Sequence, residues 1–413
     1  RRAEQGRMTV SKRARHYLGE PAPLVQAHYI AAEDPWSQAN PDGYINLGTA
    51  ENHLLFDLLE PKLTAPRAIT AADTHYQHLQ GLPSFRAELA RFLARQRSTE
   101  VDPDDLVVAG GATVVLEILA QVLCDPGDGI VVPAPYYAGL DHDLAGRSGA
   151  RIVAAPLDPA AGFALTAEAV EHAIVRARGR GQTLRAVALL SPHNPLGHVY
   201  DERTLRAVAD VTMGQGLQLI VDEIYAGSVY DGSFVSAARL VPSVVPPERL
   251  HLVWGFGKDF GLSGYKAGVL HTRDPQVLAA ARHLAMFGPV SSDTQVLLRD
   301  LLADREWTDR FLAAGAARLG AAYECTVKAV EQQGISVLPA AAGLFVWMDL
   351  RASLAEPTFD AEHALWQRIF TEAKVNISPG GVFHCAEPGW FRLCFAADRE
   401  AVSLAITRLS RRL

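Results

Sequence analysis

A lysine in an unusual setting is the first candidate for chemistry. Lys258 lies in the apolar, glycine-containing stretch VWGFGKDFGLSGYKAG (253–268), where burying a long cation costs free energy. An amine kept from water has a lowered pKa and can attack an aldehyde. Asp222, in the earlier segment VDEIY, could hold a protonated ring nitrogen, and Tyr225 in the same segment could donate to a phenolate oxygen.

Three further segments suit a flat, phosphorylated ring. Asn194 in SPHNPLG could share the phenolate oxygen, and Tyr137 in PAPYYAG could stack on the ring. The turn GGAT (110–113) offers backbone amides to a phosphate at Ala112 and a hydroxyl at Thr113. Together these groups match the edges of pyridoxal 5′-phosphate (PLP).

Each of these residues alone also has an ordinary structural explanation. Asp222 fits an acid at a strand end, NPLG fits a turn, and Tyr137 fits a packed aromatic residue. GGAT fits a generic strand-to-helix turn, and Lys258 fits a surface lysine. Their order and spacing along the chain favour the chemical interpretation over a set of coincidences.

The segments between these residues predict an α/β fold. Apolar runs such as LVVAGG, GIVVPAP, RAVALLSP, LQLIVDEIY and LHLVWGFG alternate with helical patterns, which predicts a mostly parallel sheet with helices on both faces. Ligands of such sheets bind at the carboxyl ends of the strands. Thr113, Tyr137, Asn194, Asp222 and Lys258 all follow or end these runs.

The pattern changes after about residue 300. A long charged amphipathic stretch (305–333) leads to ISVLPA, GLFVWMDL and WFRLCFA, which predicts a smaller α+β domain. We therefore expect an N-terminal segment (1–60) that packs with the small domain, a large PLP-binding domain (61–300) and a small C-terminal domain (301–413).

Composition excludes several classes of protein. The chain of 413 residues is 49% hydrophobic and 21% charged, with a net charge of −7, which argues against a nucleic-acid or membrane-surface binder. Its four cysteines are scattered without a CxxC pair, so we expect neither a disulfide framework nor a metal site. No apolar run reaches membrane-spanning length, and we expect a cytoplasmic protein.

Several longer blocks resemble one family. INLGTAENHLLFDLL (45–59), GLPSFR (81–86), PAPYYAGLDHDL, GKDFGLSGYKAG and FHCAEPGWFRLCFA (383–396) resemble fold type I PLP enzymes of the class I/II aminotransferase superfamily. Within it the closest resemblance is to 1-aminocyclopropane-1-carboxylate (ACC) synthases. The resemblance runs from about residue 44 onward.

The resemblance implies roles for particular residues. Lys258, Tyr225 and Asp222 would be catalytic: the lysine holds the cofactor and moves the substrate α-proton, and the aspartate keeps the pyridine nitrogen protonated. Arg392 would clamp the substrate α-carboxylate with its guanidinium fork. Glu51 would face the sulfonium side of the substrate, although a residue there could also merely cap the following helix.

Four positions depart from the family pattern. Gly255 and Gly257 stand where the family usually has serines, and Lys266 replaces an arginine near the phosphate. Leu79, in QHLQGLP, replaces a tyrosine that normally reaches across a dimer interface to the cofactor and substrate. Two interpretations remain open: looser PLP binding, or room for a second or larger ligand.

The implied function is a reaction of S-adenosylmethionine (SAM) in a homodimer. After α-deprotonation, methylthioadenosine leaves from Cγ. The product is ACC, or a C–C bond forms with a second substrate such as a pyridinium nucleotide. The alternative is an amino-acid aminotransferase, which shares Lys258, Asp222, Tyr225, Asn194 and Arg392. A transcription regulator would need a helix-turn-helix module, and the residues before YINLG show no such pattern. An inactive scaffold would not need both Lys258 and Asp222, which are present.

Overall fold

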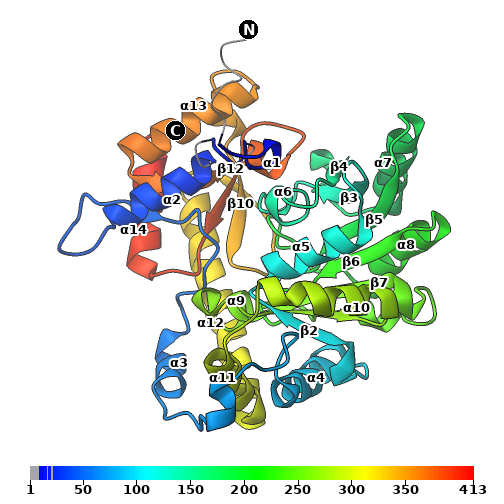
Figure 1. Ribbon diagram of the computed structural model, residues 1–413. Helices are drawn as coiled ribbons and strands as arrows, with labels where there is room; N and C mark the ends of the chain where they lie inside the picture. Colours follow the sequence, from blue (N-terminus) through cyan, green and yellow to red (C-terminus); the bar gives the residue numbers. More distant parts are fainter. Residues whose placement is uncertain (1–8, 16, 20–21) are drawn as a thin grey trace.

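The computed structural model describes residues 9–15, 17–19 and 22–413, which contain a larger and a smaller β-sheet unit (Figure 1). The larger sheet has the strand order β2-β8-β7-β6-β5-β3-β4. Its strands are β2 (Leu106–Ala109), β3 (Gly129–Ala134), β4 (Arg151–Pro156), β5 (Leu184–Leu190), β6 (Gln218–Asp222), β7 (Leu250–Gly255) and β8 (Gly268–Thr272). β8 alone runs in the direction opposite to the other strands of this sheet, so the prediction of a mostly parallel sheet is confirmed.

Helices cover both faces of the large sheet because its strands are apolar on both sides. Successive residues of β3 point to opposite faces: Ile130 packs in the cluster that contains α5 (Ala112–Leu123) and α10 (Pro275–Leu284). Val131 packs in the cluster that contains α7 (Ala167–Gly179) and α8 (Glu202–Gly214). This three-layer arrangement leaves the strand ends as the accessible edge of the sheet.

The remaining helices of the large unit are α4 (Pro83–Arg97), the short α6 (Leu140–Asp143), α9 (Phe256–Asp259) and α11 (Ser292–Ala303). Side chains fix where the covering helices begin. Thr166 Oγ1 accepts a hydrogen bond from the Ala169 amide at the start of α7, and Asp201 Oδ1 accepts one from the Thr204 amide at the start of α8. Such caps satisfy amides that the first turn of a helix leaves unpaired.

The smaller sheet is antiparallel, with the order β12-β13-β10-β9. Its strands are β9 (Ser336–Leu338), β10 (Phe345–Asp349), β12 (Ser378–Pro379) and β13 (Trp390–Cys394), and its helices are α12 (Arg305–Glu331), α13 (Phe359–Glu372) and α14 (Arg399–Ser410). The smaller α+β unit predicted from the sequence is therefore present.

The N-terminal segment contributes α1 (Lys12–Arg15), α2 (Pro23–Glu33), β1 (Ile45–Asn46) and α3 (Phe56–Leu63). β1 pairs in parallel with β11 (Val375–Asn376), and Ile45 is buried in the core of the smaller unit. Leu59 of α3, however, packs in a cluster with Trp254 of the large sheet. The domain boundaries at residues 60 and 300 stay a prediction, and residues 1–8 of the first segment lie outside the described part.

Among the described residues, no helix combines the length and the apolar character needed to cross a membrane.

Candidate active site

The carboxyl ends of the parallel strands border a cavity of about 620 Å³. Segments that follow β3, β5, β6 and β7 all reach it, and β13 reaches it from the smaller unit. The predicted residues that line it are Ala112, Thr113, Tyr137, Asn194, Asp222, Tyr225, Lys258, Lys266 and Arg392. The fold thus brings together side chains that are scattered over most of the chain.

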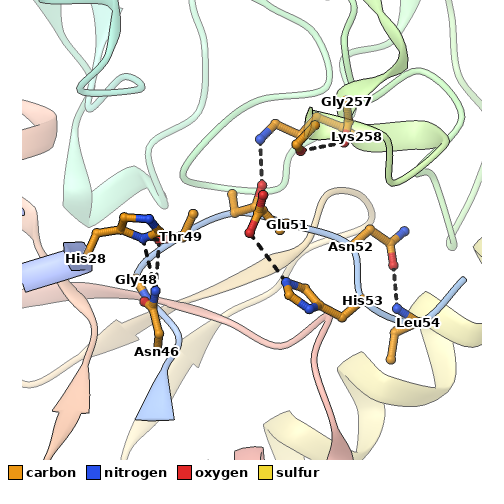
Figure 2. Close-up of polar contacts among 12 residues, drawn as sticks. His28, Asn46, Gly48, Thr49, Glu51, Asn52, His53, Leu54, Gly257 and Lys258 are labelled. Atoms are coloured by element: carbon orange, nitrogen blue, oxygen red, sulfur yellow. Dashed lines mark hydrogen bonds and ion pairs between the residues drawn. The ribbon is translucent and has the colours of Figure 1, made fainter. Parts of the chain in front are cut away.

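Lys258 lies on the single turn of α9 that follows β7, with its side chain in the cavity wall. Its Nζ donates a 2.5 Å hydrogen bond to the Ala50 carbonyl, which belongs to the N-terminal segment (Figure 2). Burial lowers the pKa of the Lys258 amine, and the positive charge of Arg392 lowers it further. The neutral amine that this favours is the form that attacks a carbonyl carbon.

Asp222 ends β6 and is 6% exposed. Its Oδ1 accepts a 3.1 Å hydrogen bond from the Ile224 amide, and burial raises its pKa to about 7. A carboxylate in these surroundings is stabilised by a cation that replaces the lost water. A protonated pyridine nitrogen in the cavity would supply that cation, so Asp222 fits PLP.

Arg392, on β13, is held by two hydrogen bonds. Its Nη1 donates to Asn194 Oδ1 at 3.0 Å, and its Nη2 donates to the Gly48 carbonyl at 2.6 Å. Its guanidinium carbon also lies 4.8 Å from the ring centroid of Phe383. The Nε is buried and has no hydrogen-bond partner among the described residues, and the guanidinium fork suits a ligand carboxylate. On the other side, Asn194 Nδ2 lies 3.5 Å from Tyr225 Oη.

The start of α5 forms the anion-binding end of the cavity. Gly111 precedes the helix with φ +97°, a conformation that favours glycine. Thr113 and Lys266 line the cavity here, and the helix N-terminus adds free amides. Asp143 is buried beside them, where burial raises its pKa to about 7 and the Thr113 hydroxyl bonds to it. These groups fit a phosphate.

Two predicted substrate residues lie outside the wall of this cavity. Glu51 follows Ala50, but its Oε2 lies 3.6 Å from His53 Nε2 (Figure 2). That contact lowers the pKa of the Glu51 carboxyl, and the charge of Lys258 contributes as well. Leu79 is 41% exposed in the loop before α4, away from the cavity of its own chain.

Two of the glycines that depart from the family pattern have different surroundings. A Cβ at residue 255 would lie 2.9 Å from the Ala267 carbonyl oxygen and 3.3 Å from Gly268 Cα, so the neighbouring strand β8 fills that space. A Cβ at residue 257 would meet only Ser263 atoms at 3.6 Å, an ordinary contact. Gly255 is thus required by backbone packing, whereas Gly257 is not.

The cavity-wall residues that sequence reasoning missed include His28, Asp143 and Ser263. His28 comes from α2, and its Nδ1 is 2.8 Å from Thr49 Oγ1 (Figure 2). Nothing in the local sequence marks it, because it reaches the cavity only when α2 packs against β1 and β11. Ser263 carried a signal, since it lies in GLSGYK between Lys258 and Lys266.

Comparisons with known proteins show the family of this chain. Residues 43–409 match the family "aminotransferase class I and II". An ACC synthase of Glycine max is 38% identical over 95% of this chain and 85% of its own length. ACC synthase 6 of Arabidopsis thaliana is 39% identical over 89% of this chain and 78% of its own length.

Solved structures share the fold. Aspartate aminotransferase from Thermus thermophilus with maleate superposes with a TM-score of 0.82 at 24% identity, covering 98% of this chain and 100% of that one. An aromatic aminotransferase from Pyrococcus horikoshii has a TM-score of 0.75 at 21% identity, covering 94% and 98%.

The family match and the ACC synthase relatives, together with this fold, identify a PLP-dependent enzyme of fold type I. The chain belongs to the class I and II aminotransferase family and is an ACC synthase-like member of it.

Proposed function

We propose that this enzyme acts on SAM, removing its α-proton and releasing methylthioadenosine from Cγ, with closure of the ring to ACC. The observation that carries the proposal is an identity of 36–40% to ACC synthases, over 85–95% of the chain. The cavity supports it with a candidate base, a candidate carboxylate clamp and an anion-binding turn that all line it.

When bound, PLP supplies an aldehyde for the substrate amine and a ring that draws electrons from Cα. Lys258 would hold the cofactor and, as a neutral amine of lowered pKa, take the α-proton as general base. Asp222 would pair with the ring nitrogen. The residues that would contact the cofactor are Ala112, Thr113, Tyr137, Asn194, Asp222, Tyr225, Lys258 and Lys266.

On the substrate side, Arg392 lines the cavity and would bind the α-carboxylate with its guanidinium fork. Asn194 would orient that fork, since it already accepts from Nη1. Glu51, with its lowered pKa, would carry the negative charge that favours a sulfonium cation near Lys258.

A homodimer forms part of the proposal. The loop before α4 exposes large side chains, with Tyr76 at 103% and Leu79 at 41% exposure, together with Ile69. A second copy that covers this loop would bury them. Light scattering should give twice the chain mass, and a monomeric mass would contradict this part.

A second candidate product follows from Leu79. The resemblance predicts a tyrosine at position 79, whose hydroxyl would face the active site of the other subunit. Leucine is smaller and has no hydroxyl, so it would leave that site larger and less polar. The carbon skeleton left after methylthioadenosine departs would then join a second substrate, such as a pyridinium nucleotide, before release.

One experiment separates these functions. PLP-loaded enzyme is mixed with SAM alone, and methylthioadenosine and amino-acid products are measured by mass spectrometry, with Lys258→Ala as the control. Methylthioadenosine with equimolar ACC supports the first proposal. Methylthioadenosine without ACC favours the second-substrate variant.

If SAM yields no methylthioadenosine, while common amino acids convert the cofactor to its pyridoxamine form, the proposal is wrong. The enzyme is then an aminotransferase.

A further inference from the structure

Ser263 lies against the lysine-bearing turn, at the start of a 3-10 turn (Ser263–Tyr265) between α9 and β8. It is half-buried and lines the cavity, as does Gly257. Its Oγ donates a 3.0 Å hydrogen bond to the Gly257 carbonyl. The hydroxyl is therefore fixed beside residue 257, one position before Lys258.

Residue 257 and the Ser263 hydroxyl border the same space. A Cβ at residue 257 would lie 3.6 Å from both Cα and Oγ of Ser263. A serine at 257 would thus carry its hydroxyl into the space that Ser263 Oγ borders. Residue 255 offers no such exchange, because the Ala267 carbonyl is only 2.9 Å from its Cβ position.

The turn that Ser263 begins leads directly to a residue placed for binding an anion. Lys266 follows the 3-10 turn with φ +49°, and its Cε lies 3.9 Å from the Cβ position of Gly111, at the start of α5. The ammonium stem thus lies over a helix N-terminus of positive potential. Lys266 supplies one compact charge and lacks the paired donors of an arginine. A nearby hydroxyl would therefore add a hydrogen-bond donor for a bound anion.

We propose that Ser263 is a phosphate-binding residue of the cofactor site, where its Oγ acts together with Lys266. On cofactor binding the hydroxyl turns from the neutral Gly257 carbonyl to a phosphate oxygen, because a charge-assisted hydrogen bond is the stronger of the two. This inference rests on PLP as the cofactor and not on SAM as the substrate, so it stands or falls separately from the proposed reaction.

The test compares PLP with pyridoxal, which lacks the phosphate. Each is titrated into cofactor-free protein, and binding is followed by absorption. Ser263→Ala should weaken PLP binding about tenfold, the usual effect of losing a hydrogen bond to a charged group, and leave pyridoxal binding unchanged. Equal weakening of both ligands, or of neither, would overturn the proposal.

Paired variants test the interchange of positions. Gly257→Ser in the Ser263→Ala background should restore PLP binding, whereas Gly255→Ser in that background should not, because its side chain meets β8. Failure of Gly257→Ser to restore PLP selectivity counts against the proposal. Should Ser263→Ala not fold, Ser263→Cys has the same shape with a weak donor and should show the same selective loss.

Discussion

Arg392 and Asn194 are 198 residues apart in the chain, yet Arg392 Nη1 donates a 3.0 Å hydrogen bond to Asn194 Oδ1. The arginine belongs to strand β13 of the smaller sheet, and the asparagine follows β5 of the larger one. The hydrogen bond from Lys258 to the Ala50 carbonyl likewise joins the large sheet to the N-terminal segment. The proposed substrate clamp and the proposed nucleophile are therefore positioned by contacts between units.

Replacing Arg392 with lysine should raise KM for the amino-acid substrate at least tenfold. Lysine keeps the charge but loses the fork that contacts Asn194 and Gly48, and hydrogen bonds to charged groups contribute about 1.5–3 kcal/mol. Steady-state kinetics measures this, with the exposed Arg399→Lys as the matched control. An unchanged KM would remove Arg392 from the carboxylate site.

Asp222→Asn should lower kcat by about 100-fold or more, the cost of losing one preorganised electrostatic stabiliser. The amide has the same shape but cannot hold a protonated ring nitrogen by charge. Burial has raised the pKa of Asp222 to about 7, so its carboxylate depends on that cation. Stopped assays measure kcat, with the exposed Asp231→Asn as the control. Near-normal turnover by Asp222→Asn would contradict the prediction.

Gly268→Ala should destabilise the phosphate-binding turn. A Cβ at this position would lie 2.4 Å from the Gly111 carbonyl carbon and 2.5 Å from the Ala112 amide nitrogen. Overpacking of this kind costs about 1–3 kcal/mol, and PLP affinity should fall as the turn shifts. Urea unfolding and PLP titration measure the two effects. Gly264→Ala, which meets no atom within 4 Å, should change neither.

Acid should destabilise the fold partly through His193. Burial lowers the pKa of this imidazole to about 3, whereas in the unfolded chain it titrates near 6.5. Between these values only the unfolded chain binds the proton, so stability falls as pH falls below about 6.5, by ~1.4 kcal/mol per pH unit.

His193→Gln should flatten this slope between pH 6 and pH 4, as measured from urea midpoints at each pH. The exposed His172→Gln serves as the control. If stability falls equally steeply with pH in wild type and in His193→Gln, burial does not lower the pKa of His193 in the folded protein.

The sequence predicted the large sheet and much of its edge because both depend on local patterns. Apolar runs of strand length, each followed by a polar or glycine-rich turn, identify parallel strands and their carboxyl ends. Topology then brings Tyr137, Asn194, Asp222 and Lys258 to one cavity, since parallel strands end on the same edge. Arg392 was placed through its family block and not through a pattern of this kind.

Only the tertiary structure decided contacts between segments that are far apart in the chain. Sequence spacing does not show that His28 and Asp143 reach the cavity, that Glu51 lies beside His53, or that β8 fills the space beside Gly255. Each depends on how one packed unit meets another, which side-chain volume and backbone position fix together. Residue types along the chain thus determined the chemistry available, and packing determined which groups face the ligand.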